Sequence, residues 1–354
     1  MKKLTLLYLF LILNIATYSQ QTRTYSERLG WQKGARVLIL HVDDAGMSHD
    51  SNEGVEKALS EGVSTSTSVM MPCAWVSDFK LYLDKNPGTD AGLHLTLTSE
   101  WDNYRWGPLA GKAAVPGLTD KQGCLYSSVE AVYFKATPDE VDKEIRAQLD
   151  RALSMGFKPT HLDSHMGTLF AKDAFMDKYL KLGIEKQIPV MFPGGDDLFY
   201  RAEAKAAIIA GLKKQGKYKK GMVIAEAAAL GRAKEIGLML WKNGLPVLDD
   251  LHNSSYDWNM PGINSKSDKQ IQTWYTNHYI ESIGRLRPGL TMVIMHCTLP
   301  SASFKYISDT GKKRQGDLLA MTDPRLMEFL RKNRFILTTW REVMERRIKA
   351  GKTD

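Results

Sequence analysis

Short apolar runs and longer stretches of helical periodicity alternate along the chain. Residues 37–42 form an apolar run rich in leucine and β-branched side chains, which is typical of a strand covered on both faces. Between such runs, apolar positions recur at helical spacing, as at 50–59, 201–215 and 268–285. Further strands are predicted at 63–71, 91–97, 159–162, 188–192, 246–251, 290–295 and 335–339.

The helix predicted after Thr137 has signals at both of its ends. Thr137 is a favourable N-cap, Pro138 occupies the first helical position and Glu140 completes a capping box. Apolar residues then recur every four positions, and Gly156 ends the helix. These apolar residues are Val141, Ile145, Leu149 and Leu153.

The alternation of strands and helices predicts an α/β fold. Seven or eight strand-helix units favour an irregular barrel of seven or eight parallel strands, either closed or incompletely closed. Binding sites of such barrels lie at the carboxyl ends of the strands. The polar stretch 98–136 is long for a connection, so we expect it to help form the substrate cleft.

The start of the chain has the layout of a secretory signal. Two lysines precede an apolar run over 4–15, and the small residues Ala16 and Ser19 follow it. A transmembrane helix needs about 20 apolar residues, so a removed signal is favoured over a membrane anchor. We therefore expect 1–20 to be a signal peptide and 21–354 a single domain. The mature protein would be periplasmic or extracellular, with no membrane span.

Composition narrows the class of protein. The 354 residues, 43% of them apolar, are enough for one large buried core. Cys73, Cys124 and Cys297 are too few for a disulfide framework, although one bridge remains open. The net charge of +8 falls to +6 when the two signal lysines are removed. The basic clusters at 217–220 and 311–315 are interpreted as solvated loops, so nucleic acid is not an expected partner.

Two adjacent carboxylates follow the first predicted strand. Asp43 and Asp44 cannot both enter an apolar core at low cost, and a metal or a cationic partner would relieve their repulsion. A tight turn with Gly46, or a helix N-cap, explains the same pair without any catalytic role. The pair is therefore a candidate site that needs support from elsewhere in the chain.

Histidines stand at or near the ends of three other predicted strands. His94 lies on an alternating strand, and His296 ends a very apolar one. In the segment HLDSH, the residues His161, Asp163 and His165 alternate, so an extended backbone presents all three on one face. Ordinary buried polar packing is the alternative for each residue. One carboxylate and two imidazoles from separate strand ends can hold a divalent metal with coordination positions left open.

Five motifs together match a known family. They are VDDAG, GLHLTLT, KPTHLDSH, the apolar strand ending in His296, and MTDPRLMEFL. Over about 36–344 the chain resembles the YdjC-like carbohydrate deacetylases, metal-dependent enzymes with a (β/α) barrel related to the polysaccharide deacetylases. Family members often read NADDFG where this chain reads HVDDAG. The likeness is weakest around 193–289, which we expect to be an insertion within the barrel domain.

The resemblance implies both a reaction and a set of site residues. The reaction is hydrolysis of an N-acetyl group on an amino sugar or oligosaccharide by a metal-activated water. Zinc and magnesium are the expected ions, because two imidazoles suit zinc and a carboxylate with open positions permits magnesium. The implied metal ligands are Asp44, His94 and His165, with Asp43 as general base and His296 as general acid.

Residues behind these ligands are also implied. Asp163 is expected to orient a ligand histidine or the base rather than to bind metal, and His161 stands beside it. Trp101, Tyr104 and Trp106 follow the His94 strand and are candidates for stacking on sugar rings, with packing inside their loop as the alternative.

Two rival classes remain open from the sequence. A glycoside hydrolase would use paired carboxylates, for which 196–197 and 249–250 are available, without needing the histidines. A non-catalytic exported sugar-binding protein would bind the same acetylated sugar and release no acetate. The oligomeric state is undetermined, with a homodimer as one candidate.

Overall fold

The computed structural model describes residues 23–224 and 231–351. The expected signal segment, 1–20, lies outside these residues. Over the described part of the chain, no helix has the length and apolar character needed to cross a membrane.

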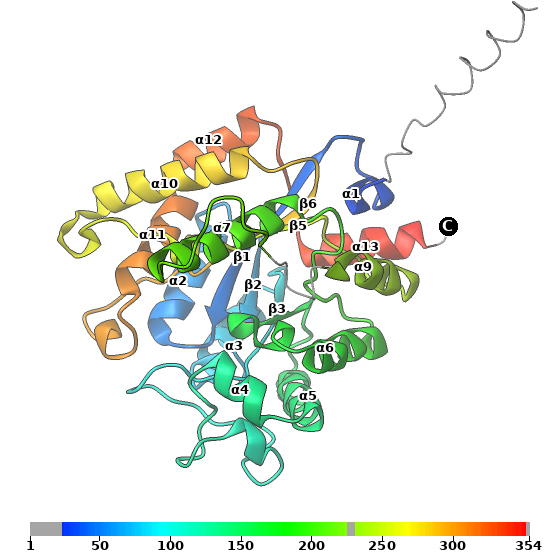
Figure 1. The fold of residues 1–354 in the computed structure, drawn as a ribbon, viewed down its shortest axis with the longest axis vertical. Helices are drawn as coiled ribbons and strands as arrows, with labels where there is room; N and C mark the ends of the chain where they lie inside the picture. The colour runs from blue at the N-terminus through cyan, green and yellow to red at the C-terminus, as the bar shows by residue number, and fades with distance from the viewer. Residues whose placement is uncertain (1–22, 225–230, 352–354) are drawn as a thin grey trace, which may run out of the picture.

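Parallel strands form one sheet at the centre of the molecule (Figure 1). They are β1 (Arg36–Ala45), β2 (Ser66–Val69), β3 (Ala91–Leu95), β4 (Leu162–Ser164), β5 (Asp250–His252), β6 (Gly289–Met295) and β7 (Ile336–Leu337). The sheet order is β4-β3-β2-β1-β6-β5, and β7 pairs with the start of β1. Strand β1 therefore lies in the middle of the sheet, where neighbours bury it on both sides.

Two isolated bridges connect the ends of this sheet. Val190 pairs in parallel with Leu162 of β4, and Pro193 pairs in parallel with Leu248, just before β5. The predicted strand 188–192 thus contributes one bridge, at Val190, rather than a regular strand. The prediction of an α/β fold built as an irregular barrel of parallel strands is confirmed.

Helices cover the outside of the sheet, with α10 and α12 along one side and α5 and α6 along another (Figure 1). The α-helices are α1 (Tyr25–Arg28), α2 (His49–Ser60), α3 (Val76–Lys85), α4 (Val129–Lys135), α5 (Pro138–Ser154), α6 (Asp173–Lys186), α7 (Leu198–Lys214), α9 (Ala233–Lys242), α10 (Asp268–Gly284), α11 (Gly311–Met321), α12 (Pro324–Lys332) and α13 (Trp340–Ala350). Short 3₁₀ turns are η1 (Pro116–Leu118), η2 (His165–Phe170), η3 (Ser255–Asp257), η4 (Ile263–Ser265) and η5 (Phe304–Tyr306).

Helix α5 has the predicted capping box. The Glu140 backbone N–H donates to Thr137 Oγ1 over 3.3 Å, and the Thr137 N–H donates to Glu140 Oε2 over 2.8 Å. Its predicted apolar positions are buried except Leu153, which is 46% exposed. A strict spacing of four residues drifts by about 40° per repeat around an α-helix. By the fourth position the side chain has therefore turned away from the core.

Strand boundaries depart from those predicted. Strand β4 runs to Ser164, two residues past the predicted end at 162, because Asp163 pairs with His94 and Ser164 with Leu95 along β3. Backbone pairing between strands is not visible in side-chain hydropathy, so polar residues at a strand end were left out of the prediction. The consequence is that Asp163 stands on the sheet itself and His165 follows it directly.

Candidate metal centre and active site

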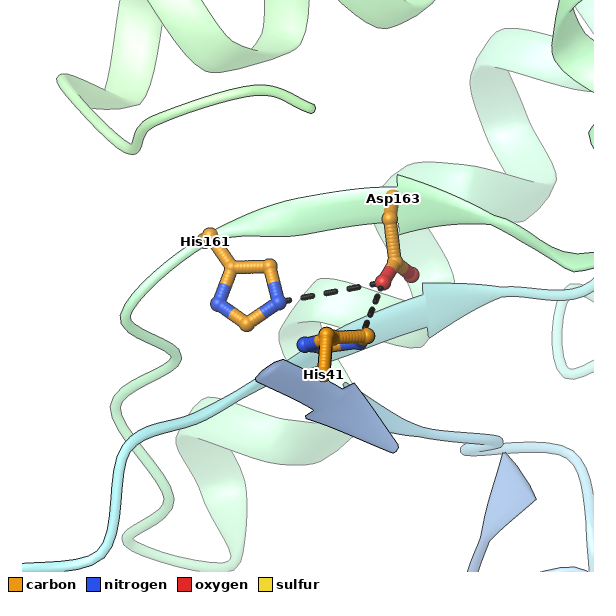
Figure 2. A group of neighbouring side chains, drawn as sticks. All are labelled: His41, His161 and Asp163. Carbon is orange, nitrogen blue, oxygen red and sulfur yellow. Dashed lines mark ion pairs between the residues drawn. The ribbon is translucent and has the colours of Figure 1, made fainter. Parts of the chain in front are cut away.

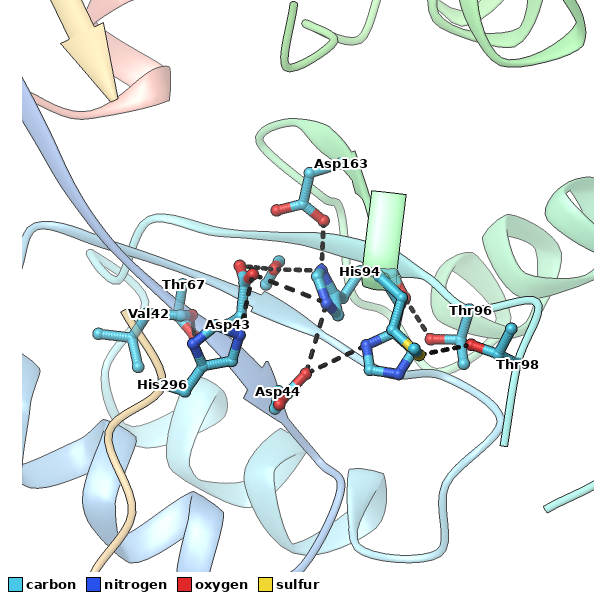
Figure 3. A network of polar contacts seen from close by, with 12 residues as sticks. Val42, Asp43, Asp44, Thr67, His94, Thr96, Thr98, Asp163 and His296 are labelled. Atoms are coloured by element: carbon cyan, nitrogen blue, oxygen red, sulfur yellow. Dashed lines mark hydrogen bonds and ion pairs between the residues drawn. The ribbon is translucent and has the colours of Figure 1, made fainter. Parts of the chain in front are cut away.

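The carboxyl ends of four strands bring the predicted site residues together (Figure 3). Asp43 and Asp44 lie near the end of β1, His94 lies on β3, and His165 and His296 directly follow β4 and β6. Parallel strands end at the same edge of a barrel, which explains the convergence of residues far apart in sequence. The side chains are buried, apart from His296, which is 15% exposed.

Asp44 Oδ1 faces two imidazole nitrogens. His94 Nε2 and His165 Nδ1 each lie 3.4 Å from this oxygen. The oxygen is buried and has no hydrogen-bond partner, which is a costly state for a carboxylate. Two imidazole nitrogens and one carboxylate oxygen are suitable donors for a divalent metal ion. The residues present therefore fit such an ion.

The backbone at the end of β1 is irregular, and this irregularity aims the carboxylates. Adjacent residues of a regular strand point to opposite faces, yet Asp43 and Asp44 both line the same cavity. The pairing of β1 with β2 shifts register between Val42 and Ala45, and Asp44 has a φ of 70°. Two residues later, Gly46 also has a positive φ, of 79°. A bend of this kind turns Asp44 toward the histidines.

Arg314 holds the other oxygen of Asp44. Its guanidinium donates to Asp44 Oδ2 over 2.6 Å, and its side chain is only 3% exposed. The interpretation of 311–315 as a solvated loop was wrong, because these residues begin helix α11 and that helix points Arg314 inward. One oxygen of Asp44 is thus neutralised by a cation, while the other faces the histidines.

Each candidate ligand histidine has its second nitrogen near another carboxylate. His94 Nδ1 lies 2.8 Å from Asp163 Oδ1, so His94 stands between Asp163 and Asp44 (Figure 3). His165 Nε2 lies 3.1 Å from both oxygens of Glu100. Contacts of this type fix the tautomer and orientation of metal-binding imidazoles. The structure thus places Asp163 where an orienting role was expected, and adds Glu100.

Charged neighbours shift the pKa values of the site residues. Burial acts to lower the pKa of His165, but the Glu100 and Asp44 carboxylates raise it to about 10. Burial alone would raise the pKa of Asp44, whereas Arg314 and His165 hold it well below its usual range. Four carboxylates, of Asp43, Asp44, Glu100 and Asp163, thus surround the histidines, with Arg314 contacting one of them. A divalent cation suits this set of carboxylates and imidazoles.

Asp43 lies beside the proposed ligands. Its Oδ1 contacts Ser68 and His41, whereas its Oδ2 is oriented toward the imidazoles of His94 and His296. Its Oδ1 accepts from Ser68 Oγ at 3.3 Å and lies 3.1 Å from His41 Nε2. Its Oδ2 is 3.8 Å from both His94 Nε2 and His296 Nε2. Asp43 can therefore exchange a proton with a molecule bound between these side chains.

His296 stands on the other side of Asp43. Its backbone N–H donates to Asp317 Oδ2 over 2.9 Å, and its ring contacts the Tyr256 ring at a centroid distance of 5.0 Å. Burial lowers the pKa of His296 to about 4, while the Asp44 carboxylate acts in the raising direction. The imidazole is therefore neutral near pH 7 and would need to gain a proton before it could act as the expected general acid.

A cavity of about 470 Å³ opens above these residues. Its lining combines the polar site with apolar and aromatic side chains, as binding sites for organic ligands commonly do. Trp101, Tyr104 and Trp106 pack against one another at centroid distances of 5.7 and 5.9 Å and do not line it. The aromatic and sulfur-containing residues that do line it are Met166, Phe170, Met191, Phe192, Tyr200 and Tyr256.

Sequence reasoning missed four members of this network. Glu100 follows the His94 strand in a loop, and His41 was seen only as part of a strand end. Arg314 and Asp317 are three residues apart on α11, and this spacing places both on the face that meets the site. This spacing is the one sequence signal that could have identified Arg314 and Asp317 as site residues. The basic run at 311–315 obscured it.

The carboxylates offered by the glycoside hydrolase alternative have structural partners. Asp249 accepts hydrogen bonds from the backbone N–H groups of Tyr25, Ser26 and Leu290. Asp250 similarly accepts from backbone N–H groups at the start of α7. These bonds join α1 and α7 to the sheet and link β6 to the residue before β5. They leave neither carboxylate arranged as an acid-base pair over the cavity.

Comparisons with known proteins agree with the geometry. The family model described as YdjC-like protein matches residues 37–332. A carbohydrate deacetylase of Thermus thermophilus is 31% identical over 319 residues, covering 90% of this chain and 97% of the relative. A chitooligosaccharide deacetylase of Yersinia enterocolitica is 32% identical over 136 residues, or 37% of this chain and 49% of that protein.

Solved structures also resemble the fold. A putative cellobiose-phosphate cleavage protein of Enterococcus faecalis superposes with a TM-score of 0.63 at 18% identity, covering 86% of this chain and 98% of that one. The family match over most of the sequence, together with the full-length likeness to the Thermus thermophilus protein, confirms the expected relationship. The chain belongs to the YdjC-like protein family.

Proposed function

We propose that this protein is a metal-dependent hydrolase that removes N-acetyl groups from an amino sugar or oligosaccharide. The observation that carries the proposal is the unpartnered Asp44 Oδ1, which faces one nitrogen each of His94 and His165 at 3.4 Å. The names of the relatives, carbohydrate deacetylase and chitooligosaccharide deacetylase, support the choice of reaction and substrate class.

Asp44, His94 and His165 would hold a divalent ion, with zinc or magnesium as the first candidates. When bound, such an ion supplies a Lewis acid for an amide carbonyl and lowers the pKa of water. Arg314 keeps Asp44 Oδ2 engaged, so Oδ1 alone is directed at the ion. Asp163 and Glu100 hold the two imidazoles in the orientation that this requires.

Asp43 is the proposed general base. Ser68 and His41 occupy the region around its Oδ1, which leaves Oδ2 as the oxygen nearest to His94 and His296. A water attacking an acetyl carbon from beside Asp44 would pass its proton to this Oδ2. The carbon-nitrogen bond then breaks as the amine receives a proton.

His296 is proposed to deliver that proton. Because its imidazole starts neutral, it must first receive a proton, and Asp43 Oδ2, at 3.8 Å from its Nε2, is the adjacent source. His296 would then protonate the departing sugar amine. The same proton would thus pass from the water to Asp43, then to His296 and then to the amine. Asp43 would return to its ionised form.

Acetate release tests the proposal. Purified protein would be screened against N-acetylated mono- and oligosaccharides with zinc, magnesium, cobalt or nickel present. Asp44→Ala and His165→Ala should lose both the bound ion and acetate release. Asp43→Asn should keep that ion and lose about 10²- to 10⁴-fold in kcat, which is the usual contribution of a general base. Asp196→Asn, at a side chain 63% exposed, is the matched control and should behave like the wild type.

The rival functions give different results in the same assay. A glycoside hydrolase would release reducing sugar and stay active after chelation of metal. A sugar-binding protein would retain ligand and release no acetate with any metal. Unchanged metal content and unchanged acetate release in Asp44→Ala would refute the site assignment.

Export is a separate part of the proposal. The sequence of residues 1–20 supports a removed signal peptide, and we infer that the enzyme acts in the periplasm or outside the cell. Amino-terminal sequencing of the protein secreted or released from its native cells would locate the cleavage site. Active protein that is purified from the cytoplasm with residues 1–20 still attached would contradict this inference.

A further inference from the structure

A second cluster of metal-ligating side chains lies next to the proposed active site (Figure 2). It consists of His41 on β1, His161 just before β4 and Asp163 on β4, all of them buried. Asp163 Oδ2 is 3.0 Å from His41 Nε2 and 3.7 Å from His161 Nε2. In Figure 2 both rings direct a nitrogen at this one oxygen.

The opposite nitrogen of each ring contacts a hydroxyl. His41 Nδ1 lies 3.0 Å from Ser66 Oγ, and His161 Nδ1 lies 3.0 Å from Thr160 Oγ1. An imidazole whose Nδ1–H donates to a hydroxyl has a lone pair on Nε2, and both contacts allow that tautomer. This is the arrangement that orients histidines for metal binding. His41 Nε2 also lies 3.1 Å from Ser68 Oγ.

The ring of His161 is also fixed by packing. It stacks on Trp340 with a centroid distance of 5.2 Å and an interplanar angle of 19°. A Cβ on Gly92 would come within 2.4 Å of the ring, so only glycine leaves room for it. The nitrogen therefore has a defined position rather than a choice of rotamers.

Two atoms of the cluster lack hydrogen-bond partners. His161 Nε2 and Asp163 Oδ2 are both buried and unsatisfied. A proton on His41 Nε2 could be donated to Asp163 Oδ2, but His161 Nε2 would still lack a partner. A cation placed between these three atoms would satisfy all of them. Ligands of a tetrahedral ion with bonds of 2.0–2.1 Å stand about 3.3–3.4 Å apart. The observed separations of 3.0 and 3.7 Å lie on either side of that value.

We propose that His41, His161 and Asp163 bind a second divalent transition-metal ion of the zinc type, distinct from the ion of the active site. Asp43 Oδ1, 3.1 Å from His41 Nε2, is placed to act as a fourth ligand. Asp163 is also one of the residues that line the cavity. Because Asp163 Oδ1 also contacts His94 at 2.8 Å, the second ion would fix the carboxylate that orients an active-site ligand. The proposal does not depend on the reaction catalysed at the first site.

Metal counting tests this inference. The wild-type protein would be reconstituted with Zn²⁺, passed into metal-free buffer and measured by plasma mass spectrometry. Two ions per chain are expected, falling to one in His41→Asn, one in His161→Phe and one in His165→Ala. The double variant His41→Asn/His165→Ala should hold none. Phenylalanine at 161 keeps the stack on Trp340 while removing both nitrogens.

His252→Asn is the matched control. His252 is fully buried, has no hydrogen-bond partner on either ring nitrogen and lies outside the cluster, so this variant should keep two ions. One ion per chain that is lost in His165→Ala but kept in His41→Asn overturns the second site and leaves the proposed function standing. One ion per chain that is lost in His41→Asn but kept in His165→Ala would support the second site and refute the metal site assigned to Asp44, His94 and His165.

Anomalous scattering gives a readout that needs no variant. Crystals of the reconstituted wild type, measured at the zinc edge, should show two peaks, one of them between His41, His161 and Asp163. A single peak beside Asp44 refutes the inference even if the variants fail to fold.

Discussion

Arg314 and Asp44 form a buried ion pair 2.6 Å long between a helix near the end of the chain and the first strand of the sheet. Both side chains are at most 3% exposed. The pair directs one oxygen of Asp44 away from the histidines and leaves the other facing them. Helix α11 is therefore as much a part of the candidate site as the strands are.

Removing Arg314 should destabilise the metal-free protein strongly. Breaking a buried ion pair leaves a buried charge without compensation and typically costs about 3–5 kcal/mol. We expect Arg314→Met to lower the free energy of unfolding by an amount in this range, measured by urea denaturation in the presence of a chelator. Arg325→Met is the control, since Arg325 pairs with Asp323 at 2.7 Å but is 42% exposed. A pair so exposed contributes about 1 kcal/mol or less. Equal losses in the two variants would contradict the burial argument.

Glu100 should control metal affinity without binding metal. Its two oxygens lie 3.1 Å from His165 Nε2, on the opposite side of the ring from Asp44. Loss of such an orienting carboxylate typically weakens metal binding by about 10- to 100-fold. Glu100→Gln should show this loss in competition titrations with a chelating dye. Glu130→Gln, at an exposed position on α4, should bind metal like the wild type. Wild-type affinity in Glu100→Gln would exclude the orienting role.

Tyr256 should contribute to substrate binding under the proposed function. It lines the cavity, is 40% exposed and lies 5.0 Å from the His296 ring. An aromatic contact is worth about 0.5–1.5 kcal/mol, which corresponds to roughly a 2- to 10-fold rise in KM. We expect this rise in Tyr256→Ala with a smaller change in kcat, and near wild-type values in Tyr256→Phe. Tyr306→Ala, at a 63% exposed residue outside the cavity lining, is the control. An unchanged KM in Tyr256→Ala would remove Tyr256 from the binding surface.

The metal-free protein should lose stability as the pH rises above neutrality. Burial opposes protonation of His41 and His165, but neighbouring carboxylates raise the pKa of His41 to about 9 and that of His165 to about 10. A group whose pKa is raised by folding stabilises the protein fully below its unfolded value, about 6.5 for histidine, and loses that contribution as the pH passes its folded value. The free energy of unfolding should therefore fall between about pH 6.5 and 10.

Variants identify the groups responsible for this slope. His165→Asn should flatten the upper part of the pH dependence of the unfolding free energy. In His252, burial lowers the pKa to about 4, so its contribution changes only below about 6.5. His252→Asn should therefore leave the alkaline slope as it is in the wild type. A stability that stays constant from pH 7 to 10 in the metal-free wild type would show that these imidazoles are not protonated.

The sequence predicted the residues at strand ends better than it predicted their neighbours. Asp43, Asp44, His94 and His165 follow or sit on apolar runs, and the rule that parallel strands end together was enough to bring them to one place. Arg314 is separated from Asp44 by 270 residues and lies on a helix whose inward face cannot be read from a run of basic residues. Only the packing of α11 against α10 and α2 makes it part of the site.

The same limit applies to the fold. The capping box before α5 could be identified because its signals are local. The segment 188–192 is apolar and is predicted as a strand, yet it joins β4 through one bridge at Val190. Whether this segment forms a regular strand depends on how the barrel closes. Barrel closure is set by pairing with distant strands rather than by the side chains of the segment.

The left-handed backbone at Asp44 restricts which metal ligand can stand there. At a φ of 70°, aspartate and asparagine are tolerated far better than longer or branched side chains. A glutamate, although a good ligand elsewhere, would strain the turn or straighten it. The backbone at position 44 therefore restricts the choice of ligand in a way that the regular strand at position 94 does not.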